Sequence, residues 1–468
     1  MITVDFSKRG ETGLCEYLYN SIKAQILEGK LPANSKLPSK RSLSSHLGIS
    51  VITTQNAYAQ LISEGYIYSI EKKGFFVTDI PVSNNSVQRG QTSMENLTPP
   101  TPTPQWFADF TSNSTSAQKF PFTLWAHTMR QVLNSSDEKL LQRSSIKGIL
   151  ELRTQIALYL KSFRNMEVSP EQIIIGAGTE ALYSMLVQFL NRSTVFAVEN
   201  PGYKKVRDIL ELNGATCIPI QLDKQGMNPK DLESTNASII HISPNHHFPT
   251  GIVMPVRRRL ELLAWANASP ERLIIEDDYD SEFRFNGKPL PTLQSTNPQS
   301  NIIYMNTFTK TLSPSFRISY MVLPPSLVND FVNKLGSYSC QVSAFEQFTL
   351  ARFMEEGNYE THINRMKNYY RSIRNTFIQN LQKSQLMPLC QITEEEAGLH
   401  FLLTVHTKEA GNILQNRLKA QGINISLLSD YFYNSEPEAA PTFVINYSCI
   451  KKDLIDETIK RMETALLT

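Results

Sequence analysis

Apolar residues near the N-terminus recur every four residues, a spacing that suits a helix. Leu14, Leu18, Ile22 and Ile26 would share one helix face, and Gly29 is a typical residue at a helix end. Two shorter helical segments follow, KRSLSSHLG and ITTQNAYAQLISEG. They are joined by the turn Gly48 to Ser50, in which Ser50 is a candidate N-cap. This pattern predicts a helix followed by a helix-turn-helix.

β-Branched and aromatic residues then indicate two short strands. YIYSI and FFVTDI flank the basic turn from Glu71 to Gly74, as expected for a β-hairpin. The helix, the helix-turn-helix and the hairpin together predict a winged-helix domain over residues 1–80.

Residues 81–105 contain almost no large apolar side chains and are rich in Pro, Ser, Asn and Thr. Four prolines, at 99, 100, 102 and 104, favour an extended and fairly stiff second half. We expect a linker here that spaces two domains and lets them move relative to one another.

Over residues 106–468, helical patterns alternate with short apolar runs. The runs are QIIIGAG, TVFAVE, ASIIHIS, RLIIEDD and NIIYMNTF. Such alternation is typical of βαβ units and predicts an α/β domain with a mainly parallel sheet. From about Gly336 onward, two long helical stretches and the strand candidates HFLLTV and TFVINYS predict a smaller C-terminal α+β lobe.

Composition narrows the class of protein without defining it. The chain has 468 residues, 41% hydrophobic and 19% charged, which suits a globular protein of two or three domains. Residues 1–80 hold nine Lys and Arg against seven Asp and Glu, so charge only weakly favours nucleic acid. The five cysteines lack disulfide or zinc spacing, and no apolar run approaches the roughly 20 residues that span a membrane. We expect a cytoplasmic protein without a metal site.

The predicted winged helix contains candidate contacts to double-stranded operator DNA. Polar side chains near the start of the second helix of such a motif read base edges, and Thr53, Thr54 and Gln55 occupy these positions. Residues expected near phosphates are Lys36, Lys40 and Arg41 before and within the first helix, and Lys72, Lys73 and Gly74 at the hairpin tip. Each of these residues taken alone is equally compatible with an ordinary solvated surface.

Two motifs at predicted strand ends carry candidate binding chemistry. After QIIIGA, Gly178 and Thr179 begin a helix whose free amides suit an anion. After RLIIE, Asp277 and Tyr279 combine a carboxylate that can hold a protonated pyridine nitrogen with a phenol that can donate to a ring oxygen.

A third motif supplies an amine. Lys310 follows the strand NIIYMNTF, with Thr307 and Arg317 nearby. A lysine can form an imine with an aldehyde cofactor, and hydroxyl groups with an arginine suit a phosphate monoester.

These motifs resemble those of a known family over nearly the whole chain. GKLPANSKLPSKRSLSSHLGIS, with AYAQLISEGYI and GFFV, resembles the GntR-type winged helix over residues 10–78. The three strand-end motifs resemble fold-type I aminotransferases, and ENPGYKKV, PNHHFPTG and AGLH agree with this resemblance. Together they resemble the MocR subfamily of GntR-type regulators, and most of all its regulators of vitamin B6 synthesis.

The resemblance implies pyridoxal 5'-phosphate (PLP) as ligand and a homodimer with PLP sites at the subunit interface. It makes Lys310 the Schiff-base lysine, Asp277 the partner of the pyridine nitrogen and Tyr279 the donor to the ring 3'-oxygen. Arg317, Thr307, Gly178 and Thr179 would hold the phosphate, with Tyr203 near the ring. The ring-contacting asparagine of the family corresponds to Phe248, or is replaced in role by Asn245 or His246. Arg41 and the Lys73-Gly74 tip match DNA-contacting positions.

Three departures from the family bear on function. The arginine that binds a substrate α-carboxylate would stand at Val444, and no arginine lies between Arg417 and Arg461. A second carboxylate-binding position is Lys205, which makes it an effector-binding candidate. In the winged helix, Val51 stands where the family usually has an arginine.

We therefore predict a PLP-binding transcription regulator that senses PLP, rather than an efficient enzyme. One alternative is a regulator that senses an amino acid or amine through a PLP adduct, with Lys205 as the carboxylate partner. Another is an active PLP-dependent aminotransferase. The sequence alone does not define the operator, or whether binding activates or represses transcription.

Overall fold

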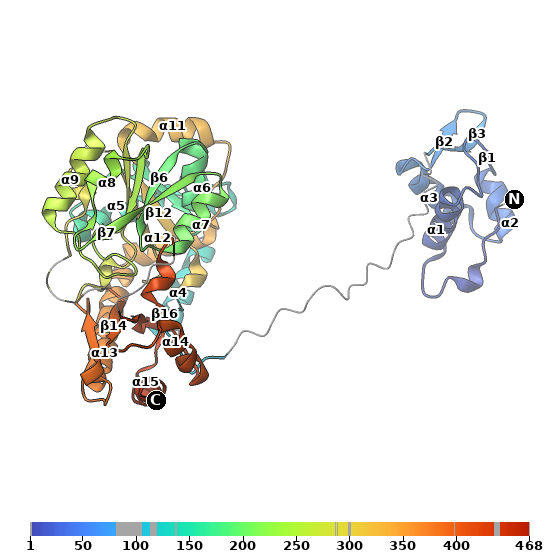
Figure 1. The fold of residues 1–468 in the computed structure, drawn as a ribbon. Helices are drawn as coiled ribbons and strands as arrows, with labels where there is room; N and C mark the ends of the chain where they lie inside the picture. Colours follow the sequence, from blue (N-terminus) through green and yellow to red (C-terminus); the bar gives the residue numbers. More distant parts are fainter. Residues whose placement is uncertain are drawn as a thin grey trace. The chain divides into compact units, whose positions relative to one another are not determined.

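In the computed structural model, the chain divides into two compact units, Met1–Thr103 and Pro104–Thr468 (Figure 1). The structure describes residues 2–80, 105–112, 119–135, 138–285, 287, 289–297, 301–396, 398–434 and 440–467. The linker predicted over 81–105 lies outside the described residues except for Gln105, as does Ala397 of the motif AGLH.

The N-terminal unit is a winged helix built around one apolar core. Leu18 and Ile22 pack in the same buried cluster as Leu43, Tyr58 and Leu61, so each of the three helices turns its apolar face inward. The elements are α1 (Leu14–Leu27), β1 (Lys36–Leu37), α2 (Lys40–Leu47), α3 (Val51–Ser63), β2 (Ile67–Ile70) and β3 (Gly74–Val77).

The turn between α2 and α3 has the predicted chemistry. Gly48 ends α2 with a φ of 66°, a left-handed conformation that suits glycine. The side chain of Ser50 accepts a hydrogen bond from the backbone N–H of Thr53 at 3.0 Å, which confirms Ser50 as the N-cap of α3. The predicted hairpin is the antiparallel pair β2 and β3. β1 adds a third strand beside β3 that was not predicted, because two residues are too few to show an alternation.

The larger unit contains an eight-stranded sheet in the order β5-β12-β11-β10-β9-β6-β7-β8. The five adjacent strands β11, β10, β9, β6 and β7 are parallel to one another. At the two ends of the sheet, β12 is antiparallel to both of its neighbours and β8 is antiparallel to β7. All five predicted apolar runs form strands of this sheet. The bounds are β5 (Ile173–Gly176), β6 (Val195–Asn200), β7 (Thr216–Asp223), β8 (Gly226–Met227), β9 (Ile239–Ile242), β10 (Leu273–Asp277), β11 (Ile302–Thr307) and β12 (Ser319–Val322).

Helices cover both faces of this sheet. Ile174 packs with Leu182 of α6 in one buried cluster, whereas the adjacent Ile175 packs with Ile156 of α5 in another. Neighbouring residues of a strand point to opposite faces, so the sheet is buried on both faces even at its antiparallel edge strand β5, as expected for a mainly parallel sheet. The helices of this part of the larger unit are α4 (Phe122–Asn134), α5 (Leu150–Arg164), α6 (Thr179–Leu190), α7 (Lys204–Leu212), α8 (Pro229–Glu233), α9 (Val256–Asn267), α10 (Leu293–Thr296), α11 (Pro325–Leu335) and α12 (Ala344–Glu355).

The C-terminal part forms the predicted α+β lobe around a four-stranded antiparallel sheet, β13-β14-β17-β16. The lobe begins later than predicted, because the helix α12 packs with α5 and β5 of the large sheet. A short strand at the start of the unit, β4 (Ala108–Asp109), pairs with β15 (Ile423–Asn424) and ties the start of the unit to this lobe. The other elements are α13 (Asn358–Gln382), β13 (Cys390–Thr393), β14 (His400–Val405), α14 (Gly411–Ala420), β16 (Ser426–Leu427), β17 (Thr442–Asn446) and α15 (Ile455–Leu466). Among the helices that the structure describes, none has the length and apolar character needed to cross a membrane.

Candidate functional site

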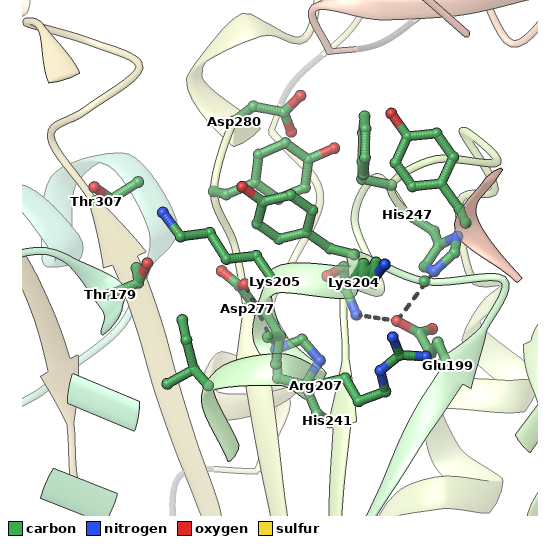
Figure 2. Close-up of a pocket in the computed structure, with 18 of the residues that line it drawn as sticks. Thr179, Glu199, Lys204, Lys205, Arg207, His241, His247, Asp277, Asp280 and Thr307 are labelled. Atoms are coloured by element: carbon green, nitrogen blue, oxygen red, sulfur yellow. Dashed lines mark hydrogen bonds and ion pairs between the residues drawn. The ribbon is translucent and has the colours of Figure 1, made fainter. Parts of the chain in front are cut away.

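A cavity of about 400 Å³ lies beside the carboxyl ends of the parallel strands in the larger unit (Figure 2). Asn200, Asp277 and Thr307 are the last residues of β6, β10 and β11, and all three line the cavity. This edge of an α/β sheet is where ligands bind. The cavity brings together these predicted residues: Thr179, Tyr203, Lys205, Asp277, Tyr279, Thr307, Lys310 and Arg317.

One carboxylate oxygen of Asp277 accepts a hydrogen bond from the protein, and the other does not. Tyr183 donates from its hydroxyl to Oδ2 at 3.0 Å, and Nε2 of His241 lies 3.6 Å from the same oxygen. The other oxygen, Oδ1, is buried and has no hydrogen-bond partner among the described residues. A buried acceptor without a donor costs free energy. This atom therefore suits the protonated nitrogen of a pyridine ring.

Lys310 lies shortly after β11, and its side chain is buried. Burial lowers the pKa of its amine below the usual value, although Cys449 and Asp280 act in the opposite direction. A lower pKa increases the fraction of neutral amine, which is the form that attacks an aldehyde. The position is therefore suited to covalent capture of an aldehyde cofactor.

A buried network fixes the hydroxyl of Tyr279. This hydroxyl lies 3.2 Å from Nδ1 of His246, and the same nitrogen lies 2.9 Å from Oδ2 of Asp280. Gly398 leaves room for the network, because a Cβ there would collide with the ring of His246. Burial raises the pKa of Tyr279 well above its usual value, so the phenol keeps its proton and can donate to a ring oxygen.

Gly178, Thr179 and Arg317 lie together at the N-terminus of α6, in a candidate cradle for an anion. Gly178 precedes α6 with a φ of 86°, and a Cβ there would collide with the guanidinium of Arg317. Thr179 begins α6, whose first amides lack partners within the helix. Nearby, the hydroxyl of Thr307 donates to that of Thr309 at 2.8 Å. A guanidinium, a helix N-terminus and hydroxyl groups are what a phosphate monoester needs.

The cations around this cradle are paired with a carboxylate in the structure. Glu180 contacts Arg317 through one oxygen and Lys205 through the other. Lys205, the predicted effector-binding residue, is thus linked through Glu180 to the predicted phosphate-binding arginine. A bound phosphate would compete with Glu180 for Arg317.

Two residues beyond the predicted set, Glu199 and His247, form a buried pair in the cavity wall (Figure 2). Oε2 of Glu199 accepts from the backbone N–H of Ser243 at 3.0 Å and lies 3.4 Å from Nε2 of His247. Burial raises the pKa of Glu199 to about 8 and lowers the pKa of His247 to about 3, so burial favours the neutral form of both groups. The motifs ENPGYKKV and PNHHFPTG contain them, but their contact depends on β6 and β9 being neighbours in the sheet.

Arg207 is a further cavity residue outside the predicted set. It lies on α7, its guanidinium is 4.4 Å from the centre of the Tyr433 ring, and Nη2 lies 3.2 Å from Oδ1 of Asp208. Lys204 and Lys205 line the same cavity. Among the described residues, the cavity therefore contains three cationic side chains in addition to Arg317, and these can bind a carboxylate.

The ring of Phe248 contacts those of Tyr203 and Tyr431. Phe248 packs edge to face with Tyr203 at 5.6 Å and with Tyr431 at 5.1 Å between ring centres. Of the three candidates for the ring-contacting position, Phe248 is among the described residues that line the cavity, whereas Asn245 and His246 are not. The side chain of Asn245 instead donates to Asp278 at 2.8 Å.

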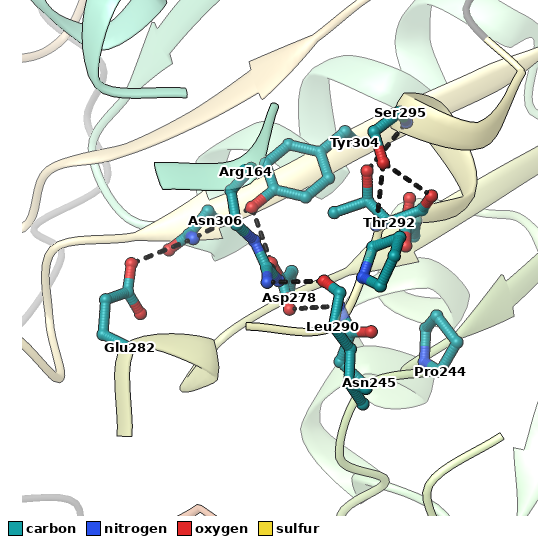
Figure 3. Close-up of polar contacts among 12 residues, drawn as sticks. Arg164, Pro244, Asn245, Asp278, Glu282, Leu290, Thr292, Ser295, Tyr304 and Asn306 are labelled. Atoms are coloured by element: carbon teal, nitrogen blue, oxygen red, sulfur yellow. Dashed lines mark hydrogen bonds and ion pairs between the residues drawn. The ribbon is translucent and has the colours of Figure 1, made fainter. Parts of the chain in front are cut away.

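Asp278 belongs to a structural network rather than to the cavity (Figure 3). It accepts hydrogen bonds from Arg164, from the hydroxyl of Tyr304 at 2.7 Å and from Asn245. Burial by itself would raise the pKa of Asp278, but the charge of Arg164 and the hydrogen bonds outweigh this effect and hold it below the usual value. The acidic run EDDYD is thus divided between two environments that the sequence does not distinguish.

In β17, Val444 stands opposite Leu402 and Ser426 and is buried. Two residues further on, Asn446 lines the cavity and donates to the backbone oxygen of Ser112 at 3.1 Å. The arginines among the described cavity residues are Arg207 and Arg317, and neither comes from this strand.

The winged helix presents most of its predicted DNA contacts at the surface. The amine of Lys40 lies 5.4 Å from the centre of the Phe75 ring, and the hydroxyl of Thr53 lies 2.8 Å from that of Ser50. Exposed residues are Lys36, Arg41, Gln55, Lys72 and Lys73, and half-buried residues are Lys40, Thr53 and Gly74.

The prediction is wrong for Thr54, whose side chain is 0% exposed. Thr54 lies four and seven residues before the core residues Tyr58 and Leu61, so it shares their inward face of α3. It is therefore not available to a base edge in this fold.

Comparison with known proteins assigns a family to each unit. Residues 14–77 match bacterial regulatory proteins of the gntR family, and residues 109–461 match aminotransferase class I and II. The two matches define a DNA-binding winged helix joined to an aminotransferase-like domain.

Several relatives are similar over nearly their whole length. The chain is 34% identical to the uncharacterized HTH-type transcriptional regulator YdeL of Bacillus subtilis, over 99% of each chain. It is 31% identical to the probable rhizopine catabolism regulatory protein MocR of Rhizobium meliloti, over 96% of this chain and 93% of the relative. It is 29% identical to the HTH-type pyridoxine biosynthesis transcriptional regulator PdxR of Corynebacterium glutamicum, over 90% and 89%. The chain therefore belongs to the MocR-type family of GntR transcription regulators.

Solved structures agree with the fold of the larger unit. The multiple substrate aminotransferase of Thermococcus profundus matches 78% of this chain and 92% of its own length, with a TM-score of 0.69 and 23% identity. This likeness shows the fold-type I aminotransferase fold alone. The predicted family and fold class are thus confirmed.

Proposed function

We propose that this regulator senses PLP and controls genes of vitamin B6 synthesis. The proposal depends on one observation: the cavity brings together most of the residues predicted to bind PLP, whereas β17 carries Val444 at the position predicted for the arginine of a substrate carboxylate. The Corynebacterium glutamicum relative, named as a regulator of pyridoxine biosynthesis, supports vitamin B6 synthesis as the target.

The cavity residues fit PLP group by group. Oδ1 of Asp277 would hold the pyridine nitrogen, Tyr279 would donate to the ring oxygen, and Lys310 would bond to the aldehyde carbon. When bound, PLP supplies an aldehyde that captures amines and a ring that withdraws electrons. The remaining contacts would be Tyr203 at the ring, and Arg317, Thr307, Gly178 and Thr179 at the phosphate.

We infer that the larger unit is a sensor and not an efficient aminotransferase. Transamination requires the α-proton of an amino acid to be held at a fixed position near the lysine, and a bidentate arginine provides this orientation. Val444 is apolar and buried, so it binds no carboxylate. Slow residual transamination is compatible with a sensor.

PLP changes DNA binding only if it binds one DNA-binding state of the protein more tightly than another, and the coupling is reciprocal. Glu180 supplies a candidate difference between two states, because phosphate and Glu180 compete for Arg317. Displaced from Arg317, Glu180 would change its contacts with Lys205 at the start of α7. A homodimer with one winged helix on each half-site would then respond as a unit.

Lys204, Lys205 and Arg207 favour a second candidate, a regulator that senses an amino acid or amine through a PLP adduct. These cations line the same cavity as Lys310. A carboxylate effector could replace Glu180 as the partner of Lys205.

Titration of the purified apoprotein with PLP distinguishes the candidates when absorbance and the gel mobility of the upstream promoter DNA are recorded in parallel. A DNA response to PLP alone, unchanged by amino acids, supports the PLP sensor. A response that requires one amino acid makes that amino acid the signal. Release of many keto-acid molecules per protein molecule would show that the chain is an enzyme.

Lys310→Ala is the sharpest variant for this test. It should retain no PLP after borohydride reduction and lose the DNA response, because Lys310 is the only lysine buried among the described residues. Lys205→Ala changes a lysine of the same cavity and should retain covalently bound PLP. A DNA response that survives unchanged in Lys310→Ala would contradict capture by this lysine.

A further inference from the structure

Two neighbouring apolar side chains are exposed on the first turn of α3. Val51 and Ile52 are the first two residues of the helix, and they are 42% and 70% exposed. Other apolar residues of the same helix, including Tyr58 and Leu61, lie in the core. The first turn of the second helix is the part of a helix-turn-helix that meets base edges in the major groove.

The surroundings of this pair favour A·T base pairs as its partner. Gln55 and Asn56 are exposed one turn further along, four residues after Val51 and Ile52, so they share the same helix face. Amide side chains pair with adenine, and apolar side chains contact the C5-methyl group of thymine.

The composition of α3 argues against guanine as the base read here. Arginine or lysine paired with guanine is the commonest specific contact, but α3 reads VITTQNAYAQLIS and contains neither. The exposed cations of this unit include Arg41 on α2 and Lys72 and Lys73 in the hairpin turn, which suits contacts to phosphates on either side.

We infer that Val51 and Ile52 contact thymine methyl groups, so that each operator half-site carries A·T pairs under the first turn of α3. This inference rests on the proposed DNA-binding function and adds the base that these residues select. Burial of an aliphatic side chain against a methyl group is favourable because both leave water.

The test uses the full chain, both with and without PLP, and a duplex selected from random DNA by the form that binds more tightly. Each thymine of the bound half-site is replaced in turn by deoxyuridine, which removes only the methyl group. We expect one or two positions at which this replacement weakens binding about threefold to tenfold. Selected duplexes should be rich in A·T pairs at the same positions.

Ile52→Ala should bind the thymine and deoxyuridine duplexes equally at its contact position. Ile62→Ala is the matched control, because Ile62 is 38% exposed at the other end of α3 and should leave the ratio unchanged. If specific DNA binding is insensitive to every deoxyuridine replacement, the inference about thymine is wrong, but the DNA-binding function is unaffected. A chain that binds no duplex in either the PLP-loaded or the PLP-free form overturns the DNA-binding function, and the inference with it.

Discussion

The cofactor cavity and the DNA-reading surface differ in how their side chains are held before a ligand arrives. In the cavity, Asp277 is fixed by Tyr183, and Tyr279 lies within reach of His246, all inside the larger unit. On the winged helix, Arg41 and Gln55 are exposed to solvent. A cavity organised in advance can bind a small molecule without paying for side-chain ordering. Substitutions in the buried network behind the cavity should therefore lower stability, those at the groups that face the ligand should change ligand binding, and those on the surface should affect DNA affinity alone.

Substitutions of the neighbours Asp277 and Asp278 should differ most in their effects on stability and PLP binding. Asp278→Asn leaves the buried guanidinium of Arg164 without its charged partner, and we expect the larger unit to lose about 3–5 kcal/mol of stability. Asp277→Asn should change stability by less than about 1 kcal/mol but weaken PLP binding, because it loses the charge that would hold the pyridine nitrogen. Urea unfolding and PLP titration measure the two effects. Equal stability of both variants would contradict the division of roles.

These two neighbours also show what the sequence can and cannot predict. Apolar strands such as β10 and β11 are recognisable because they are buried on both faces, and residues just after them reach the cavity. The partner of Asp278 is Arg164, which is 114 residues away, and no local pattern indicates that contact. The pair Glu199 and His247 likewise depends on strand order. For Thr54 a signal existed, since its spacing from Tyr58 and Leu61 marks the inward face of α3.

Glu199 should give the next largest effect, which is a dependence of the free energy of unfolding on pH. Its pKa rises from 4.5 to about 8 on folding, so the folded protein holds a proton that the unfolded chain has lost. The contribution of Glu199 to the free energy of unfolding is therefore fully present below pH 4.5, and it falls as the pH rises to about 8. We expect Glu199 to account for a loss of up to about 3 kcal/mol between pH 6 and pH 8.

Glu199→Gln removes this titration, so its stability should fall less than that of the wild type between these pH values. Glu276 and Glu282 have raised pKa values of about 7, but they are present in both proteins and cancel in the difference. Urea unfolding at the two pH values is the measurement. Parallel pH profiles for wild type and variant would show that Glu199 is ionised in the folded protein.

Glu180→Gln gives a smaller effect that concerns the anion cradle. The variant loses the charge that pairs with Arg317 and Lys205, so phosphate no longer competes with a carboxylate. Because these side chains are partly exposed, we expect PLP to bind only about twofold to fivefold more tightly. Glu171→Gln is the control, since Glu171 pairs with Lys147 and Arg153 outside the cavity. Weaker binding of PLP by Glu180→Gln would mean that Glu180 positions Arg317 for the phosphate.

Thr54→Val gives the smallest expected effect and tests the DNA-reading side of the contrast. The hydroxyl of Thr54 is buried without a hydrogen-bond partner among the described residues, and valine has nearly the same shape. We expect stability to change by less than about 1 kcal/mol, in either direction, and operator affinity to be unchanged. Gln55→Ala, one residue further along α3, changes an exposed side chain and should weaken binding in the same gel-shift assay. Loss of operator binding by a folded Thr54→Val variant would show that α3 lies on DNA with a different face from the one exposed here.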